Sequence, residues 1–345
     1  MKSWRRLASV PIVVLALMSG CSSNDSTSNS RRQNISTIGH LIGPVVDLSL
    51  SDHWLVWSSS SKRPKGQRRA GPEASRIDLV IAHARDNSHE YRFSAHGQAT
   101  SNLAVVSNNF VLSRETIALA KPRCQQRECF TWQLWLLNLE NGKGKLVAQS
   151  TVPGTEASNP IPVAAPGTFA WQQQDNSGRI VTRVMSADGS MLRTVALSSG
   201  SSQISISKGI LFADALGDRR LSLHETNLSN GTDLSRRLGK DMFRPWGNAG
   251  KLAILDGISG ERIRVLVGAT TGPLQEIYSS ADVYEAIPLP NGTVVWDYLG
   301  LHLIQPGQSP EPPRDLLSTA RIAINGNEYA YAHETSPGAV AIEIR

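Results

Sequence analysis

One short pattern recurs along most of this chain and limits the folds that are open to it. From Val45 onward, an apolar strand that often carries an aromatic residue is followed by a polar or acidic residue. Seven such strands can be counted: Trp54–Trp57, Phe110–Leu112, Phe169–Trp171, Ile210–Phe212, Leu252–Leu255, Val294–Trp296 and Tyr329–Tyr331. Repetition at a near-constant spacing predicts an architecture built from equal structural units.

Tight turns and flanking strands complete each unit. Six turns rich in Gly, Asn and Asp follow the aromatic strands: Asp86-Asn87-Ser88, Asn141-Gly142, Asp188-Gly189, Asn230-Gly231, Thr271-Gly272 and Pro306-Gly307. Asn-Gly and Asp-Gly turns connect antiparallel strands because both residues accept positive φ. A short strand such as Lys145–Val147 follows each turn, and an apolar strand such as Val45–Leu50 precedes each aromatic one. Each unit is therefore expected to be a sheet of four antiparallel strands.

Four-stranded units in series predict an all-β fold, a β-propeller; a pair of β-sandwiches is the alternative. The aromatic strands number seven but the turns only six, because the last unit stops at Ile342–Arg345, before its turn and fourth strand. Residues Ile35–Ile42 have strand character and precede the first unit. We predict seven four-stranded blades, the last closed by this N-terminal strand so that no sheet edge is exposed at the seam. Six or eight blades are the alternative counts.

The phrase Leu137-Asn-Leu-Glu-Asn-Gly-Lys143 resembles the blades of two groups of exported propellers. These are the periplasmic component of the Tol–Pal system and the PQQ-repeat lipoprotein of outer-membrane assembly. The resemblance is one of pattern: Leu146 and Val147 stand where a PQQ repeat has an aromatic residue, and the Ser-Pro-Asp-Gly phrase of the Tol propeller is absent. The resemblance implies a propeller fold and carries over no specific activity.

The N-terminus has the features of an export signal. Lys2, Arg5 and Arg6 precede an apolar run, Val10–Leu17, that is too short to span a bilayer as a permanent helix. The sequence Leu17-Met18-Ser19-Gly20-Cys21 resembles the bacterial lipobox. The resemblance implies a signal peptide at residues 1–20 and a lipid-modified, palmitate-bearing Cys21; an ordinary secretory signal is the alternative. Polar residues 21–33 are expected to be a flexible tether, and residues 34–345 the propeller domain.

The net charge of the chain and its expected compartment limit the classes of partner that it could bind. The net charge of +6 falls to +3 once Lys2, Arg5 and Arg6 are removed with the signal peptide, which argues against nucleic acid. We expect an exported monomer, lipid-anchored to the cell membrane or outer membrane and facing the periplasm or the exterior. Cys124 and Cys129 would form a local disulfide in that oxidising compartment; two free thiols are the alternative.

Two long connections are the candidate partner-binding site. In a propeller, the loops after the aromatic strands emerge on one face, and residues 58–76 and 113–131 are long there and rich in cations. Loops on a rigid scaffold are common recognition sites, so an acidic protein or an anionic envelope component is the expected partner. The alternative is a solvated loop without a partner. The candidate residues are Lys62, Arg63, Lys65, Arg68, Arg69, Arg123 and Arg127.

Five acids follow the aromatic strands: Glu115, Asp214, Asp256, Asp297 and Glu334. They would lie around the mouth of the central channel and hold a cation or a basic ligand; the alternative is that they cap loops or pair with arginines. Trp54, Trp57, Trp171 and Trp296 are expected to pack between blades.

No nucleophile elbow or metalloprotease spacing is present, so no catalytic residue, metal or cofactor is predicted. The favoured function is a non-catalytic, lipid-anchored envelope platform for protein or envelope partners. The alternatives are an exported glycan-active hydrolase or lyase that uses the channel acids, and small-ligand sensing in the channel.

Overall fold

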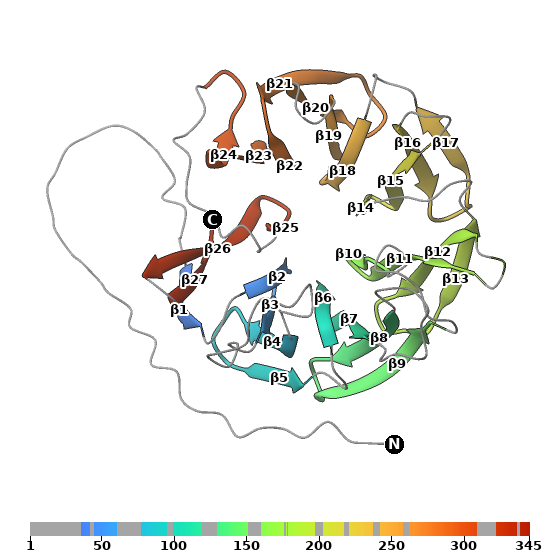
Figure 1. Ribbon diagram of the computed structural model, residues 1–345, viewed down its shortest axis with the longest axis vertical. Coiled ribbons are helices and arrows are strands. Elements are labelled where there is room, and N and C mark those ends of the chain that lie inside the picture. Colours follow the sequence, from blue (N-terminus) through green and yellow to red (C-terminus); the bar gives the residue numbers. More distant parts are fainter. Residues whose placement is uncertain are drawn as a thin grey trace, which may run out of the picture.

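A computed structural model describes residues 36–41, 45–60, 77–94, 99–118, 130–150, 160–175, 177, 179–196, 203–216, 221–236, 242–257, 262–308, 322–336 and 339–345. Every regular element in these residues is a β-strand. The strands form seven separate sheets that stand like spokes around a central axis (Figure 1). In six of the sheets the first strand along the chain lies nearest the axis, and in the remaining one, which contains β1, the strand nearest the axis is β25. The prediction of an all-β, seven-bladed propeller is confirmed.

Each blade uses consecutive strands, except the last. Blade 1 contains β2 (Val45–Leu50), β3 (Trp54–Ser60), β4 (Ile77–Ala84) and β5 (Glu90–Ser94). Blade 2 contains β6 (Ala99–Ser107), β7 (Phe110–Ala118), β8 (Phe130–Asn138) and β9 (Lys143–Gln149). Blade 3 contains β10 (Val163–Ala165), β11 (Thr168–Gln174), β12 (Ile180–Ser186) and β13 (Leu192–Ala196). Blade 4 contains β14 (Ile204–Ser207), β15 (Ile210–Leu216), β16 (Leu221–Asn227) and β17 (Asp233–Arg236).

The remaining three blades complete the ring. Blade 5 contains β18 (Met242–Asn248), β19 (Lys251–Asp256), β20 (Ile263–Ala269) and β21 (Leu274–Ser280). Blade 6 contains β22 (Val283–Leu289), β23 (Gly292–Asp297) and β24 (Gly300–Ile304); the fourth strand expected at Asp315–Leu317 lies outside the described residues. Blade 7 contains β25 (Ala323–Asn325), β26 (Glu328–Ser336), β27 (Ala339–Ile344) and, as its outermost strand, β1 (Ser36–Leu41).

The seam of the ring joins the two ends of the described chain. β1 pairs antiparallel with β27, placing Ser36 opposite Ile344, Ile38 opposite Ile342 and Leu41 opposite Val340. The N-terminal strand therefore completes the last blade, as predicted. β1 covers the edge of β27 that would otherwise be the rim of the blade, so the last blade has four strands and the two ends of the described chain are held together.

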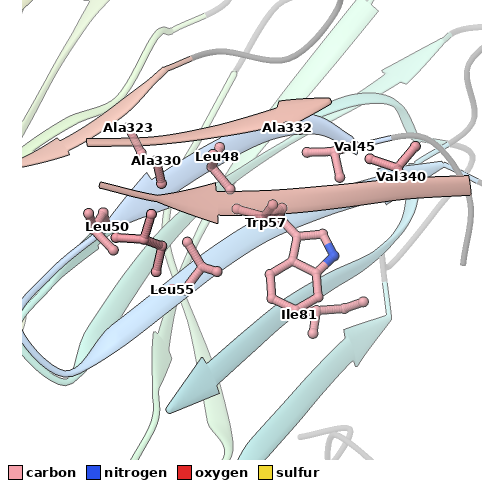
Figure 2. Packing of buried hydrophobic residues seen from close by; sticks show 12 residues of the cluster. Val45, Leu48, Leu50, Leu55, Trp57, Ile81, Ala323, Ala330, Ala332 and Val340 are labelled. Carbon is pink, nitrogen blue, oxygen red and sulfur yellow. The ribbon is translucent and has the colours of Figure 1, made fainter. Parts of the chain in front are cut away.

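Neighbouring blades share their cores through alternate residues of each second strand. In β3, Leu55 and Trp57 belong to the cluster shared with blade 7, whereas Trp54 and Val56 belong to the cluster shared with blade 2. Figure 2 shows the first cluster, in which Trp57 lies beside Ile81. Successive side chains of a strand point to opposite faces, and both faces are covered here. This explains why the aromatic strands read as continuous apolar runs.

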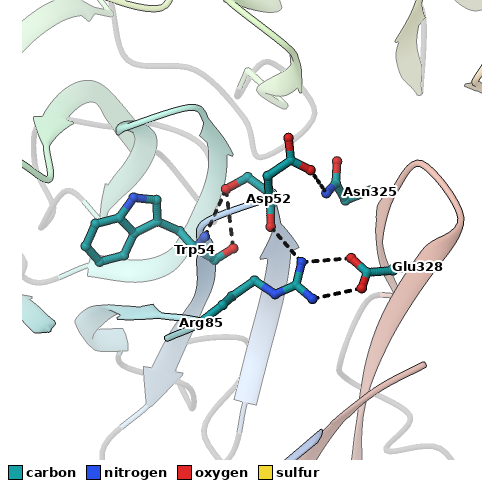
Figure 3. Close-up of polar contacts among 6 residues, drawn as sticks. Asp52, Trp54, Arg85, Asn325 and Glu328 are labelled. Atoms are coloured by element: carbon teal, nitrogen blue, oxygen red, sulfur yellow. Dashed lines mark hydrogen bonds and ion pairs between the residues drawn. The ribbon is translucent and has the colours of Figure 1, made fainter. Parts of the chain in front are cut away.

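Polar contacts fasten blade 1 to blade 7 on one side of the ring (Figure 3). Arg85 Nη1 and Nη2 donate to the two carboxylate oxygens of Glu328 at 2.7 and 2.8 Å. Asn325 Nδ2 donates to Asp52 Oδ1 at 2.6 Å. A bidentate pair of this kind fixes geometry as well as adding attraction. These residues lie in or beside the turns that link first to second, and third to fourth, strands, and we call this side of the ring the turn face.

Candidate binding surface

The opposite side of the ring is the loop face, where second strands end and third strands begin. β3 ends at Ser60 and β4 begins at Ile77, whereas β7 ends at Ala118 and β8 begins at Phe130. The two long connections therefore leave the same face from neighbouring blades. The predicted binding cations lie outside the described residues: Lys62, Arg63, Lys65, Arg68, Arg69, Arg123 and Arg127. The same holds for Cys21, Cys124 and Cys129.

Four of the five predicted channel acids are buried at this face. Glu115 and Asp256 are 2 % exposed, and Asp214 and Asp297 are 1 % exposed. Asp214 accepts hydrogen bonds from the backbone N–H groups of Gln203 (2.9 Å) and Arg244 (3.3 Å). Glu334 lies in β26, and its side chain is outside the described part of the chain. Asp214 thus ties together backbone segments of blades 4 and 5.

The other two acids with described contacts are held by side chains of blades 5 and 6. The Asp256 carboxylate pairs with Arg264 of the neighbouring strand. Asp297 accepts from Tyr278 Oη at 2.7 Å and from the backbone N–H of Leu299 at 2.8 Å, and its Oδ1 lies 3.0 Å from His302 Nε2. Buried carboxylates require such partners because desolvation of an unpaired charge is costly. These acids fit the loop-capping and arginine-pairing alternative in their described contacts.

The pKa values of Tyr278 and Asp297 are both shifted from their usual values. Burial raises the pKa of Tyr278 to about 12, with a further contribution from its hydrogen bond to Asp297. Burial opposes ionisation of Asp297, but the hydrogen bonds from Tyr278, the Leu299 amide and His302 outweigh it and lower the Asp297 pKa. Both shifts keep a neutral phenol donating to an ionised carboxylate. The cluster therefore holds the β23–β24 turn in position through the hydrogen bond from the Leu299 amide to Asp297.

Large side chains are exposed at the β23–β24 turn and at the neighbouring start of β22. Tyr284 is 39 % exposed, Tyr298 58 % and Leu299 54 %. Tyr284 lies against half-buried Trp296, with ring centroids 5.1 Å apart. Arg244 of blade 5 donates to the backbone oxygen of Tyr284. We call Arg244, Tyr284, Trp296, Tyr298 and Leu299 the aromatic patch. It lies where β22 begins and β23 ends, on the loop face.

Backbone strain occurs within the patch. Arg244 has φ of +53°, a left-handed conformation that is uncommon for residues other than glycine. It sits at the irregularity in β18 between Phe243 and Trp246. The Arg244 N–H bond to Asp214 and its guanidinium bond to blade 6 hold it in this conformation. Strained residues that are held by their surroundings cluster at functional sites.

The buried aromatic residues of the second strands could be predicted from the sequence, whereas the exposed ones of blade 6 could not. Trp54, Trp57 and Trp171 are 8 %, 3 % and 0 % exposed, which confirms the prediction of packing between blades. Trp296 is only half-buried. Tyr284 is exposed between buried Val283 and Glu285, and no feature of the sequence signals this, because the acid of a Val-Tyr-Glu run is the residue expected to face solvent. Tyr298 and Leu299 form a two-residue turn, whose length left them no strand to pack into.

The described residues contain neither a metal-binding cluster nor a membrane-spanning helix. No group of three or more His, Cys, Asp or Glu side chains in them is arranged to hold a metal ion. No helix in the same residues has the length and apolar character needed to cross a membrane.

Comparisons with known proteins show the fold and no family. The chain is similar to the β-propeller domain of the Trilobed protease from Pyrococcus furiosus, with a TM-score of 0.61 and 7 % identity over 88 % of this chain and 94 % of that one. BamB from Moraxella catarrhalis gives 0.47 and 11 % over 87 % and 85 %. TolB from Acinetobacter baumannii gives 0.42 and 11 % over 77 % of this chain and 59 % of TolB. No protein-family model matches the chain, and no curated protein matches it. At 7 % identity the similarity to the Trilobed protease domain shows the β-propeller fold alone, and the seven sheets make the chain a seven-bladed β-propeller.

Proposed function

We propose that this protein is a lipid-anchored, non-catalytic binding platform of the cell envelope, whose partner docks on the loop face. The aromatic patch is the observation that supports it. Tyr, Trp and Arg are the residues that most often dominate binding energy in protein interfaces. Here two tyrosines, a tryptophan, a leucine and an arginine lie together, with Tyr298 and Leu299 more than half exposed.

The backbone of the aromatic patch is held by hydrogen bonds, so a partner could bind it without a change in backbone conformation. The Tyr298 N–H donates to the Asp282 carbonyl at 3.2 Å, and the Leu299 N–H donates to Asp297. The Arg244 guanidinium donates to the backbone oxygen of Tyr284 and so holds the Tyr284 backbone in place. A surface that is already ordered loses little conformational entropy when a partner binds. The patch is therefore suited to a stable partner.

The basic connections extend the same proposal. Residues 61–76 and 119–129 leave blades 1 and 2 on the face that carries the patch. Their cations would raise the local concentration of an anionic partner through long-range attraction. A partner that offers apolar side chains to the patch and acidic groups to the cations is the chemistry we expect.

The lipid anchor is compatible with an accessible loop face. Ser36 is paired with Ile344 at the end of β27 that lies on the turn face. An anchor at Cys21 would approach the ring from that side, leaving the loop face turned toward the envelope space. We expect Cys21→Ser to move the protein from the membrane fraction to the soluble fraction.

A glycan-active hydrolase or lyase is the second candidate, favoured by the Tyr284–Trp296 pair, since aromatic rings also stack on sugars. Against it, the four described channel acids are at most 2 % exposed. A general acid must reach the bond that it protonates. Glu115→Gln and Asp256→Asn would abolish activity of such an enzyme and leave partner binding unchanged.

Site-specific cross-linking in cells tests the platform. A photo-reactive p-benzoylphenylalanine replaces Tyr298 in one strain and Leu146 in a control strain, because Leu146 is 37 % exposed on the outer strand of blade 2. We expect one discrete adduct from position 298 that is lost in the Tyr284→Ala background and after the charge swap Arg68→Glu with Arg69→Glu. Identical adducts from both positions would refute a specific site on the loop face.

A further inference from the structure

The interface of blades 3 and 4 differs from the other six interfaces in the composition of its apolar core. The core is aliphatic and consists of Ala170, Val184, Ile204, Ile206, Leu211, Ala213 and Leu228. In the described residues, each of the other six clusters contains an aromatic side chain or packs against one. Aromatic side chains bury large areas and dominate the energetics of cores and interfaces. Blades 3 and 4 are therefore joined without the contribution that the other interfaces share.

Blade 3 also directs buried polar atoms without partners toward blade 4. Ala170 and Val184 lie opposite each other in β11 and β12 and belong to the shared core. Side chains two residues apart lie on one face of a strand, so Gln172 and Thr182 face blade 4 as well. Gln172 Nε2 and Thr182 Oγ1 are buried without a hydrogen-bond partner among the described residues. The same holds for Nε of Arg193, which lies opposite Val184 in β13.

The desolvation cost of these atoms exists only while the two blades are packed together. A buried polar atom without a partner loses its hydrogen bonds to water and gains none in return. When the blades separate, water reaches the atom and this cost disappears. An interface held by a paired group behaves differently: between blades 4 and 5, the Gly247 N–H donates to Ser205 Oγ at 3.0 Å, and separation breaks this bond.

The strands and turns at this interface add limited contact. The inner strands are short, with three residues in β10 and four in β14, whereas β2 has six and β6 has nine. On the turn face, a groove of about 370 Å³ lies between the β12–β13 and β16–β17 turns. There, Arg193 Nη1 donates to the Ser229 carbonyl at 3.2 Å in an exposed contact. In the described residues, no other interface combines an aliphatic core, unpartnered donors and an open groove.

The seam lies across the ring from this interface (Figure 1). Blades 1–3 separate the two on one side and blades 4–7 on the other. The seam is held by the pairing of β1 with β27, by the bidentate pair of Arg85 and Glu328, and by a core that contains Trp57. The place where the chain ends meet is thus more firmly held than the interface opposite to it.

We propose that the ring opens at the interface of blades 3 and 4 while the seam stays closed. Openings of this kind require less free energy than global unfolding. Blades 1–3 and blades 4–7 then move as two bodies. The basic connections leave blades 1 and 2, and the aromatic patch lies on blades 5 and 6, so the opening changes the distance between these two surfaces. The proposal depends neither on the lipid anchor nor on the identity of a partner.

Cysteine labelling of the full chain in detergent micelles tests the proposal. Ala213→Cys places a thiol between blades 3 and 4, Ala332→Cys places one in the seam, and Ala253→Cys places one between blades 5 and 6. All three alanines are at most 1 % exposed. N-ethylmaleimide reacts with a buried thiol when an opening exposes it, and peptide mass spectrometry quantifies each position separately from the native cysteines. We expect labelling at position 213 to be about tenfold faster than at 332 or 253.

Thr182→Val in the Ala213→Cys background isolates the cause. Valine has nearly the shape of threonine and lacks the hydroxyl, so labelling at position 213 should slow about fivefold while labelling at position 332 is unchanged. Thr116→Val is the matched control, because Thr116 Oγ1 is also buried without a partner among the described residues but belongs to blade 2. It should leave labelling at position 213 unchanged. Ala170→Cys reports on the same interface from blade 3 and replaces Ala213→Cys if that variant does not fold.

Three results would overturn the proposal. Equal labelling at all three positions would show that the thiols react only through global unfolding. Faster labelling at position 332 than at 213 would place the opening at the seam. Unchanged labelling at position 213 after Thr182→Val would remove the unpartnered hydroxyl as a cause. Because no partner takes part in the labelling, its failure is distinguishable from failure of the cross-linking test.

Discussion

The interface between blades 4 and 5 leaves no room for a side chain at Gly247. A Cβ built on this residue would lie 2.8 Å from Ser207 Cβ and 2.9 Å from two ring carbons of Phe212. Carbon atoms in favourable contact are about 3.5–4.0 Å apart, so the Phe212 ring would have to move. Phe212 is fully buried, and the Gly247 N–H donates to Ser205 Oγ at 3.0 Å, which holds the two strands together.

We therefore predict that Gly247→Ala lowers the free energy of unfolding by about 1–3 kcal/mol, the usual range for overpacking a well-packed core. Urea denaturation followed by tryptophan fluorescence measures this as a lower midpoint with an unchanged slope. Gly272→Ala is the matched control, because its nearest heavy atom, Ala269 Cβ at 3.3 Å, belongs to an exposed alanine that can move by the few tenths of an ångström required. We expect it to cost about 0.5 kcal/mol or less, as for surface substitutions.

A second substitution identifies the cause. Phe212→Leu removes ring atoms and leaves space beside position 247, so it should be destabilising alone and should relieve the overlap in the Gly247→Ala background. The double variant should lose about 1 kcal/mol less unfolding free energy than the two single variants lose in sum. A coupling of this size is typical of residues in contact. Additive effects, or a Gly247→Ala variant as stable as the control, would refute the reasoning.

Three further predictions concern the seam and two titrating clusters. Ile342 is fully buried in the seam core, so Ile342→Ala should cost about 2–5 kcal/mol in urea unfolding, and a cost below about 1 kcal/mol would contradict a closed seam. A hydrogen bond to Glu90 raises the pKa of His83 above 6.5, so the stabilisation is complete below pH 6.5 and is lost as pH rises through the folded pKa. His83→Gln should thus cost up to about 0.5 kcal/mol more at pH 5.5 than at pH 8.5, a small value because the pair is partly exposed, and an equal cost at both pH values would count against the pair. The raised pKa of Tyr278, about 12, predicts stabilisation that is complete below pH 10 and is lost as pH rises through 12; an absorbance titration should show this late step in the wild type and lack it in Tyr278→Phe.

The seam and the blade number could be predicted from sequence because each rests on local chemistry. Turns such as Asn141-Gly142 mark strand boundaries through positive φ, which Gly142 adopts at 66°. Runs such as Leu252–Leu255 are buried on both faces, and this burial makes them continuous in sequence. The deficit of one strand after Ile344 pointed to the strand at Ser36–Leu41.

The binding surfaces could not be predicted in the same way, because they form between blades. Arg244 and Tyr284 approach each other only when blades 5 and 6 pack together. Arg193 reaches the Ser229 carbonyl only because the turns of blades 3 and 4 adjoin. Neither pair has a characteristic spacing in sequence. The buried state of Asp214 and Asp297 likewise depends on amide donors that are not encoded by residue type.

The pairing of β1 with β27 also determines at what stage of synthesis the last blade can fold. Ser36–Leu41 is the first described strand to be synthesised, and its partner Ala339–Ile344 is the last. A chain that emerges N-terminus first must hold its opening strand without a partner while the other sheets form, because contacts so distant in sequence form late. Only a molecule that includes residues 339–344 can complete this pairing. A prematurely terminated chain that lacks residues 339–344 would therefore leave strand edges unpaired. Proteases and chaperones recognise such edges.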